Sequence, residues 1–235
     1  MLTLRPAAER GHADHGWLRT WHSFSFADYY DPRHMGWGNL RVINEDIVAP
    51  GTGFGMHGHR DMEIITYMLA GELTHRDSMG HTATLRAGEV QHMSAGRGVM
   101  HSEMNHGAQP VHLLQIWILP RVRGIAPSYS QAPMDTTAGR GRLAPVALPV
   151  DHPEAAPLRI HADAALYAAR LDGADTAQHA LAPGRLGYVH VVRGRLAVNG
   201  VPLAAGDAAL AHDEPLLTLS DAQAAEVLLF DLAPA

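Results

Sequence analysis

Apolar and β-branched residues occur along the chain in short runs, separated by clusters of Gly, Pro, Asn and Asp. Such runs are typical of β-strands, and the turn residues mark where the strands end. No segment keeps a helical period for more than about ten residues, and many short strands at roughly 8–12-residue spacing predict an all-β barrel or sandwich. The Ala-rich segment 162–170 fits a short helix or a strand. The predicted strands are 40–44, 63–69, 112–119, 187–192, 195–198 and 226–232.

Proline divides the chain into two parts. Seven prolines lie between Pro120 and Pro157, a composition typical of linkers. We therefore expect a front domain at 1–120, a Pro-rich linker at 121–157 and a rear domain at 158–235.

A weak internal repeat relates the two parts. In the front part, residues 67–73 (YMLAGEL) are followed by 86–89 (RAGE), and in the rear part, residues 190–196 (HVVRGRL) are followed by 204–207 (AAGD). Each copy has a strand, a Gly turn, a second strand and a second turn of Gly plus an acid. The pattern predicts two copies of one β-unit, of which the rear copy is shorter.

The composition removes several kinds of chemistry. The chain has no Cys and no Lys, so its 18 basic side chains are all Arg, and His is nearly as frequent at 17. These absences exclude a thiolate nucleophile, a Cys-ligated metal and a Schiff-base lysine. The remaining candidates are His, Asp, Glu, Ser, Tyr and Arg, or a metal held by nitrogen and oxygen.

The charge and the apolar runs also bear on partners and location. A formal net charge of −6 argues against direct binding of nucleic acid or of an anionic membrane. The longest apolar runs, such as 113–119, are far shorter than the roughly 20 residues of a membrane span. Residues 1–10 lack the apolar stretch of a signal peptide, so we expect a cytoplasmic protein.

Two pairs of polar residues point to a metal site. They are His57-Gly58-His59 and His101-Ser102-Glu103. Residues i and i+2 of a strand point to the same face, so each pair can present two ligands from one strand. If the strands are neighbours, three imidazoles and one carboxylate converge, a donor set that suits Fe(II), Mn, Ni, Co, Cu or Zn.

The sequence around these pairs resembles the two motifs of the cupin superfamily. Residues 51–63 (GTGFGMHGHRDME) contain a Gly, five residues, His-x-His and then a Glu. Residues 88–105 resemble the second motif, with Ser94 where Pro is usual and two extra residues before His101. Spacing, ligand identity and turn glycines agree, so the resemblance is specific.

Further segments resemble the pirin family more closely, and the resemblance spans nearly the whole chain. The short rear part resembles the bacterial members reported as quercetin 2,3-dioxygenases. The resemblance implies two cupin barrels in one chain, with a metal only in the front barrel, bound by His57, His59, His101 and Glu103. The segments are 11–17 (GHADHGW), 22–26 (HSFSF), 40–44 (LRVIN), 94–103 (SAGRGVMHSE) and 226–232 (EVLLFDL).

The rear copy of the repeat has lost the corresponding ligands. When Gly194 is aligned on Gly71, apolar residues take the positions of the first-motif His and Glu residues. These apolar residues are Ala180, Ala182 and Leu186. We therefore expect a degenerate rear barrel that serves packing, and a single metal site.

Other residues of the front part receive secondary roles. Glu63 is expected to orient a metal-binding imidazole rather than to bind the metal. His75, His81 and His92 flank turns and are expected at the surface or behind the ligands. Five residues could line an apolar pocket for a flat aromatic substrate, with core packing as the alternative for each: Phe54, Met56, Tyr67, Met93 and Trp117.

The pirin resemblance implies a metal-dependent dioxygenase that cleaves a flavonol such as quercetin with O2, with Glu103 also acting as general base. The implied cofactor is one divalent transition metal, Fe(II) being preferred over Ni, Mn, Co, Cu or Zn. Two alternatives stay open: a cupin oxygenase for another enediol or catechol-like substrate, and a metal-binding regulatory protein of the pirin type that interacts with a protein partner.

Overall fold

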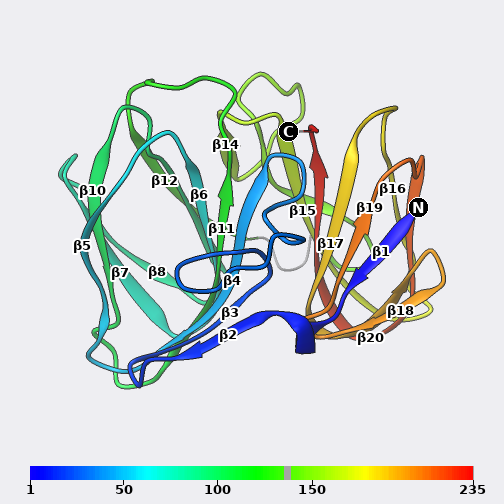
Figure 1. Ribbon diagram of the computed structural model, residues 1–235, viewed down its shortest axis with the longest axis horizontal. Helices are drawn as coiled ribbons and strands as arrows, with labels where there is room; N and C mark the ends of the chain where they lie inside the picture. Colours follow the sequence, from blue (N-terminus) through cyan, green and yellow to red (C-terminus); the bar gives the residue numbers. More distant parts are fainter. Residues whose placement is uncertain (135–138, 235) are drawn as a thin grey trace.

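The protein consists of two β-barrels that lie side by side (Figure 1). The structure is a computed structural model that describes residues 1–134 and 139–234. Within these residues the only helical element is the 3-10 turn η1 (Ala7–Glu9). The architecture confirms the predicted all-β fold of two cupin barrels, and the Ala-rich segment lies mostly in strand β15 (Ala164–Gly173).

The front barrel is built from two sheets that face each other. The four-stranded sheet has the order β5 (Gly53–His59), β10 (Val99–Met104), β7 (Glu72–Asp77) and β8 (Thr82–Arg86). The seven-stranded sheet has the order β12 (Ser128–Pro133), β9 (Glu89–Ser94), β6 (Glu63–Ala70), β11 (Val111–Ile118), β4 (Leu40–Val48), β3 (Leu18–His22) and β2 (Gly11–Asp14).

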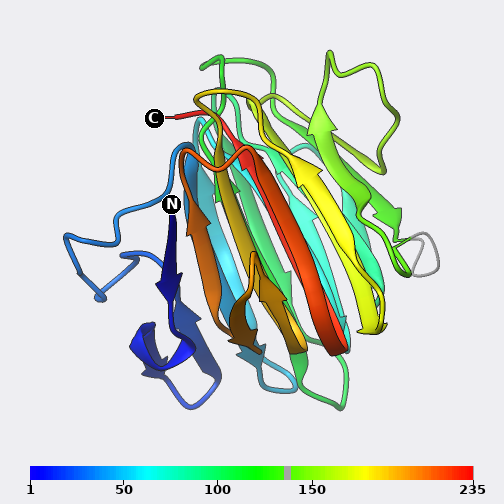
Figure 2. The same cartoon turned by 90° about the vertical axis from the view of Figure 1, so that its right-hand side faces the viewer.

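The rear barrel is one continuous sheet, seen face-on in Figure 2. Its main path has the order β1 (Leu2–Arg5), β19 (Ala208–Ala211), β17 (Leu186–Val198), β20 (Leu216–Leu232), β15, β13 (Ala144–Pro149) and β14 (Leu158–Ile160). Two further strands, β16 (Ala177–Ala180) and β18 (Val201–Ala204), pair with β20 and β17. Among the described residues, no helix is long and apolar enough to cross a membrane.

The central strands of the seven-stranded sheet, β9, β6, β11 and β4, are buried on both faces. In β6, Ile65 and Tyr67 belong to a core cluster shared with the rear barrel, whereas Ile64 and Met68 belong to clusters inside the front barrel. Successive side chains of a strand point to opposite faces, so each strand serves two cores. For this reason apolar residues do not alternate strictly with polar ones along the sequence.

Polar contacts also join the two barrels. The Tyr67 hydroxyl on β6 donates a hydrogen bond of 2.8 Å to the buried Glu226 carboxylate on β20. The guanidinium of Arg193 on β17 donates to the carbonyl of Leu69 at 2.8 Å and lies 3.7 Å from Glu226. The relative position of the barrels is therefore fixed by directional bonds as well as by apolar packing.

A second cluster of charges ties the N-terminal segment to the seven-stranded sheet. Glu45 on β4 lies 2.9 Å from the Arg10 guanidinium and accepts a hydrogen bond of 2.9 Å from His112 on β11. Burial alone would raise the pKa of Glu45, but His112 and Arg10 outweigh burial and lower this pKa to about 2.

The predicted internal repeat is visible in the backbone hydrogen bonds of the turns. The amide of Ala87 donates to the carbonyl of Gly71 at 3.1 Å, and in the rear barrel the amide of Ala205 donates to the carbonyl of Gly194 at 2.9 Å. Both glycines have a positive φ, +77° and +68°, which residues with a Cβ rarely adopt. The alignment of these two glycines is therefore confirmed.

Some segments cross from one part of the chain to the other. Strand β1 pairs with β19, so the first strand belongs to the rear sheet. Residues 121–157, expected as a linker, contain β12, which extends the front sheet beside β9, and β13, which pairs with β15 and β14 of the rear sheet. The segment thus contributes one strand to each barrel.

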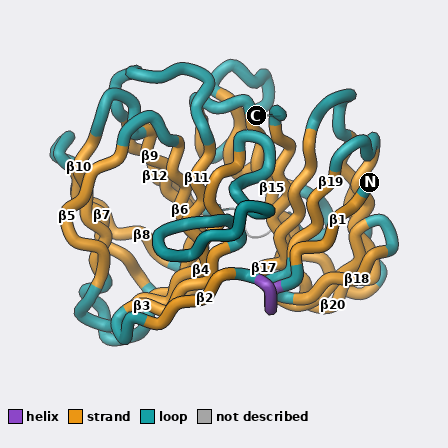
Figure 3. The backbone as a smooth tube through the Cα atoms, viewed as in Figure 1, coloured by secondary structure: helices purple, strands orange, loops and turns teal. Residues whose placement is uncertain are grey.

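The loop at 23–39, between β3 and β4, crosses the front of the molecule (Figure 3). Phe26 packs edge-on against Trp117 of the front barrel at 5.3 Å between ring centroids. The indole nitrogen of Trp37 donates to the carbonyl of Gly187 in the rear barrel at 2.9 Å. The loop is therefore held at both ends and forms part of the wall of the front barrel.

Candidate metal centre

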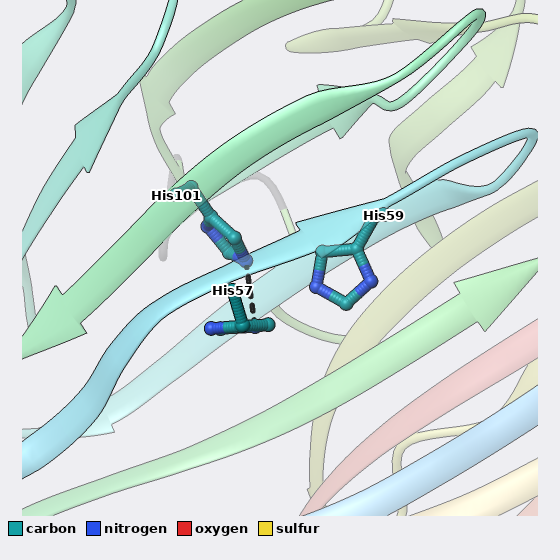
Figure 4. A group of neighbouring side chains, drawn as sticks. All are labelled: His57, His59 and His101. Atoms are coloured by element: carbon teal, nitrogen blue, oxygen red, sulfur yellow. Dashed lines mark hydrogen bonds between the residues drawn. The ribbon is translucent and has the colours of Figure 1, made fainter.

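Three histidines converge inside the front barrel. His57 and His59 project from β5, and His101 projects from the neighbouring β10, where it is the register partner of His57 (Figure 4). One ring nitrogen from each lies within 4.8 Å of the others, and the ring centroids are 4.5 to 4.9 Å apart. The i, i+2 spacing of β5 and the pairing of β5 with β10 produce this geometry, as the sequence predicts.

Hydrogen bonds orient two of these imidazoles. Nδ1 of His57 donates to the carbonyl of Gly55 at 2.7 Å, which leaves Nε2 with a free lone pair. On the other side of the site, Nε2 of His75 lies 3.0 Å from the Asp77 carboxylate and must carry the proton of that bond. Nδ1 of His75 is then an acceptor, and Nδ1 of His101 donates to it at 3.5 Å.

With these tautomers, the two Nε2 lone pairs of His57 and His101 face each other at 3.1 Å. Burial lowers the pKa of His101 to about 3 and that of His59 to about 4, so these imidazoles are neutral at pH 7. Facing lone pairs repel unless a cation lies between them. The donor set therefore fits a divalent transition metal that prefers nitrogen ligands.

Glu103 lies deeper in the barrel than the three histidines. A bulge between His101 and Glu103 shifts the register so that Glu103 pairs with Phe54. Its Oε1 accepts a hydrogen bond of 2.6 Å from Nε2 of Gln91, and its Oε2 accepts one of 3.0 Å from Nε2 of Gln115. Burial raises the pKa of Glu103 to about 7.

The structure therefore brings the four predicted ligands together in two overlapping groups. His57, His59 and His101 form the first, and Glu103 forms the second with His101 and His75, again within 4.8 Å. Among the described residues, both groups of this kind lie in the front barrel.

Glu63 makes other contacts than the sequence suggested. Its carboxylate accepts hydrogen bonds from His92 at 2.8 Å, from Ser94 at 2.6 Å and from the backbone amide of His161 at 2.8 Å. These bonds join β6 to β9 and to the start of the rear barrel. The imidazole that Glu63 orients is thus His92, which is no member of the three-histidine group.

A cavity of about 530 Å³ contains the histidines. Phe54, Met56 and Trp117 line it, as predicted, and Trp117 packs edge-on against His59 at 4.9 Å between ring centroids. Tyr67 and Met93 do not line it: Tyr67 faces the rear barrel, and Met93 is buried beneath the cavity wall with Ile64.

Sequence reasoning missed the polar side chains that support or face the site. Thr66, Gln91 and Gln115 surround Glu103, while Thr20 and Asp46 line the cavity. Thr66 and Gln115 interrupt mostly apolar strands, whereas Thr20, Asp46 and Gln91 lie in strands with other polar residues. Such interruptions in strands buried on both faces are the signal that could have revealed Thr66 and Gln115, because a buried polar group needs a partner.

Comparison with known proteins agrees with this geometry. Residues 3–118 match the family model of pirin, and residues 150–232 match that of the quercetinase C-terminal cupin domain. The chain belongs to the pirin family. It is 45% identical over its full length to the full-length quercetin 2,3-dioxygenase of Escherichia coli K12, and 43% identical over 99% of its length to the full-length pirin-like protein of Caulobacter vibrioides.

Solved structures of a bacterial pirin are similar as well. The crystal structure of YhhW from Escherichia coli matches with a TM-score of 0.94 and 45% identity, covering 100% of this chain and 99% of that one. YhhW in complex with nickel(II) matches with a TM-score of 0.94 and 44% identity over the whole of both chains. A pirin with this fold therefore binds a divalent metal.

Proposed function

We propose that the protein is a metal-dependent dioxygenase that cleaves a flavonol such as quercetin with O2. The observation that carries this proposal is the convergence of His57, His59 and His101 in a cavity lined by aromatic side chains. Its volume of about 530 Å³ falls in the range of small-molecule sites, roughly 300–1,000 Å³. The name quercetin 2,3-dioxygenase of the Escherichia coli relative supports the substrate class.

The chain's own residues divide the work. His57, His59, His101 and Glu103 would hold one divalent metal, Fe(II) or the nickel seen with YhhW. When bound, this metal supplies a Lewis acid that lowers the pKa of a substrate hydroxyl and a centre that can react with O2. Glu103, whose pKa lies near neutrality, accepts the proton of that hydroxyl. Phe54 and Trp117 orient the flat rings and exclude water.

The test is aerobic incubation of protein loaded in turn with iron, nickel, manganese, cobalt and copper with quercetin. Loss of the flavonol absorption band with uptake of O2 and release of carbon monoxide is the expected result. His57→Ala should abolish both metal binding and turnover, whereas His179→Ala in the rear barrel should change neither. An unchanged flavonol band with all five metals refutes the proposal.

The two roles of Glu103 are separable by one variant. Glu103→Gln keeps the shape of the side chain but removes its ability to take up a proton. We expect turnover to fall at least about 100-fold, the range of general acid–base catalysis, while metal content measured by elemental analysis falls much less. Equal loss of both would remove the base role and leave only a ligand.

A further inference from the structure

The cavity has a second polar wall, opposite the histidines. His57, His59 and His101 come from the four-stranded sheet, whereas Thr20 and Asp46 come from β3 and β4 of the facing seven-stranded sheet. Thr20 and Asp46 are register partners in this pair of strands, so their side chains lie next to each other on the cavity side.

Both side chains are buried, and each keeps a polar atom without a hydrogen-bond partner. Asp46 and Thr20 are each 3% exposed, and neither Oδ1 of Asp46 nor Oγ1 of Thr20 has a hydrogen-bond partner among the described residues. The next cross-strand pair behaves differently, because Nδ1 of His22 lies at hydrogen-bond distance, 2.8 Å, from Oδ1 of Asn44. Of the other residues that line the cavity, Trp117 also has a buried polar atom, Nε1, without a hydrogen-bond partner among the described residues.

Keeping Oδ1 of a carboxyl group buried without a partner costs free energy. Packing does not require it, because the next residue on the same face of β4, Val48, is apolar and fully buried in the core of the front barrel. An unsatisfied group that lines a ligand-sized cavity is instead suited to a polar group of the ligand.

We propose that Asp46, with Thr20 beside it, binds a hydroxyl group of the aromatic substrate on the wall facing the three histidines, so that the site selects ligands with hydroxyl groups on two edges. This inference rests on the proposed function and adds the part of the substrate that is recognised away from the histidines. A hydroxyl suits this position whatever the protonation state, because it donates to a carboxylate and accepts from a carboxylic acid. The Thr20 hydroxyl group can donate a hydrogen bond to a free lone pair of the substrate hydroxyl group, or accept one from its proton.

The test compares two flavonols against variants of Asp46. Quercetin carries hydroxyl groups on all its rings, whereas 3-hydroxyflavone has only the one beside the carbonyl. Both are titrated without O2 into nickel-loaded wild type, Asp46→Ala and Asp46→Asn, and their dissociation constants are measured. Asp46→Ala should weaken the binding of quercetin at least about tenfold, because it leaves the hydroxyl group of the ligand buried without its partner. It should weaken the binding of 3-hydroxyflavone less than about twofold, because this ligand has no hydroxyl group there. Asp46→Asn keeps one acceptor and should lie between.

A purely structural role for Asp46 predicts a different outcome. If the carboxyl group stabilised the fold, both variants would unfold at lower temperature and weaken both ligands equally, which would overturn the proposal. We expect instead that Asp46→Ala unfolds at a temperature equal to or above that of wild type, because it removes an unsatisfied buried group. Asp163→Asn, at the edge of the rear barrel, is the matched carboxylate control and should not change either dissociation constant.

The outcomes distinguish this inference from the proposed function. If wild type cleaves quercetin and the Asp46 variants bind both flavonols with unchanged dissociation constants, the role of Asp46 is refuted and the proposed function stands. Wild type that binds neither flavonol when loaded with any of the five metals refutes both.

Discussion

His75 is the residue whose replacement tests how the metal site is supported. It is fully buried, stacks on Tyr129 at 4.4 Å between ring centroids, and connects Asp77 to the back of His101. His75→Phe keeps an aromatic ring in this place and removes both nitrogens. His101 then loses the acceptor that fixes its tautomer and ring orientation, so its Nε2 is no longer held towards the site.

The size of the effect follows from the length of the contact. Partners behind a metal-binding His are typically worth about 10- to 100-fold in metal affinity. The nitrogens of His75 and His101 are 3.5 Å apart, at the long end for a hydrogen bond, so we expect the lower end of this range. A tenfold loss corresponds to about 1.4 kcal/mol.

His81→Phe is the matched control. Nδ1 of His81 also lies 3.0 Å from the Asp77 carboxylate, and its ring stacks on Tyr129 at 5.4 Å between ring centroids. Among the described contacts, however, none joins His81 to His101. Nickel affinity is measured by competition with a chelator, and thermal unfolding of metal-free protein reports folding. The reasoning is refuted if His75→Phe folds and binds nickel as wild type does, or if His81→Phe loses as much affinity.

Three further predictions concern stability. Because its pKa is low, Glu45 stabilises the fold fully above about pH 4.5, and this contribution is lost as the pH falls towards 2. Glu45→Gln should lower the free energy of unfolding in urea by about 3 kcal/mol at pH 7 and make it depend less on pH below 4.5; an unchanged pH dependence contradicts this. Tyr67→Phe should lower the free energy of unfolding by about 1–3 kcal/mol, because it leaves the buried Glu226 with one hydrogen-bond donor fewer. The affinity for nickel should stay unchanged; a lower affinity would contradict this and show that the bond between the barrels supports the metal site. Gly194→Ala should cost more than about 1 kcal/mol in thermal unfolding, since φ is +68° and the new methyl group would meet the Ala224 carbonyl; an unaffected unfolding temperature would disprove the importance of this turn.

Local spacing explains why so much of the metal centre is predictable. A His-x-His and a His-x-Glu pair each define one face of a strand, and the turn glycines around them define where the strands begin and end. The convergence of His57, His59 and His101 depends only on the pairing of two such strands. The repeat was predictable for the same reason, because its glycines occupy turns that need a positive φ.

Long-range packing explains what could not be predicted. Glu63 follows the first motif closely in sequence, yet it lies near the end of a strand whose neighbour is β9, and it therefore binds His92. Tyr67 looks like a pocket residue, but the parity of β6 turns it towards the rear barrel. Which face of a doubly buried strand meets the cavity is decided by the partner sheet, and a single sequence does not contain that information.

The pairing of β1 with β19 affects the order of assembly. Leu2 is synthesised well before its register partner Ala211. Chains are made from the N-terminus and contacts between distant residues form slowly, so β1 stays unpaired until β19 has been made. It then closes an edge of the rear sheet, so completion of this sheet depends on a strand that is synthesised before the front barrel.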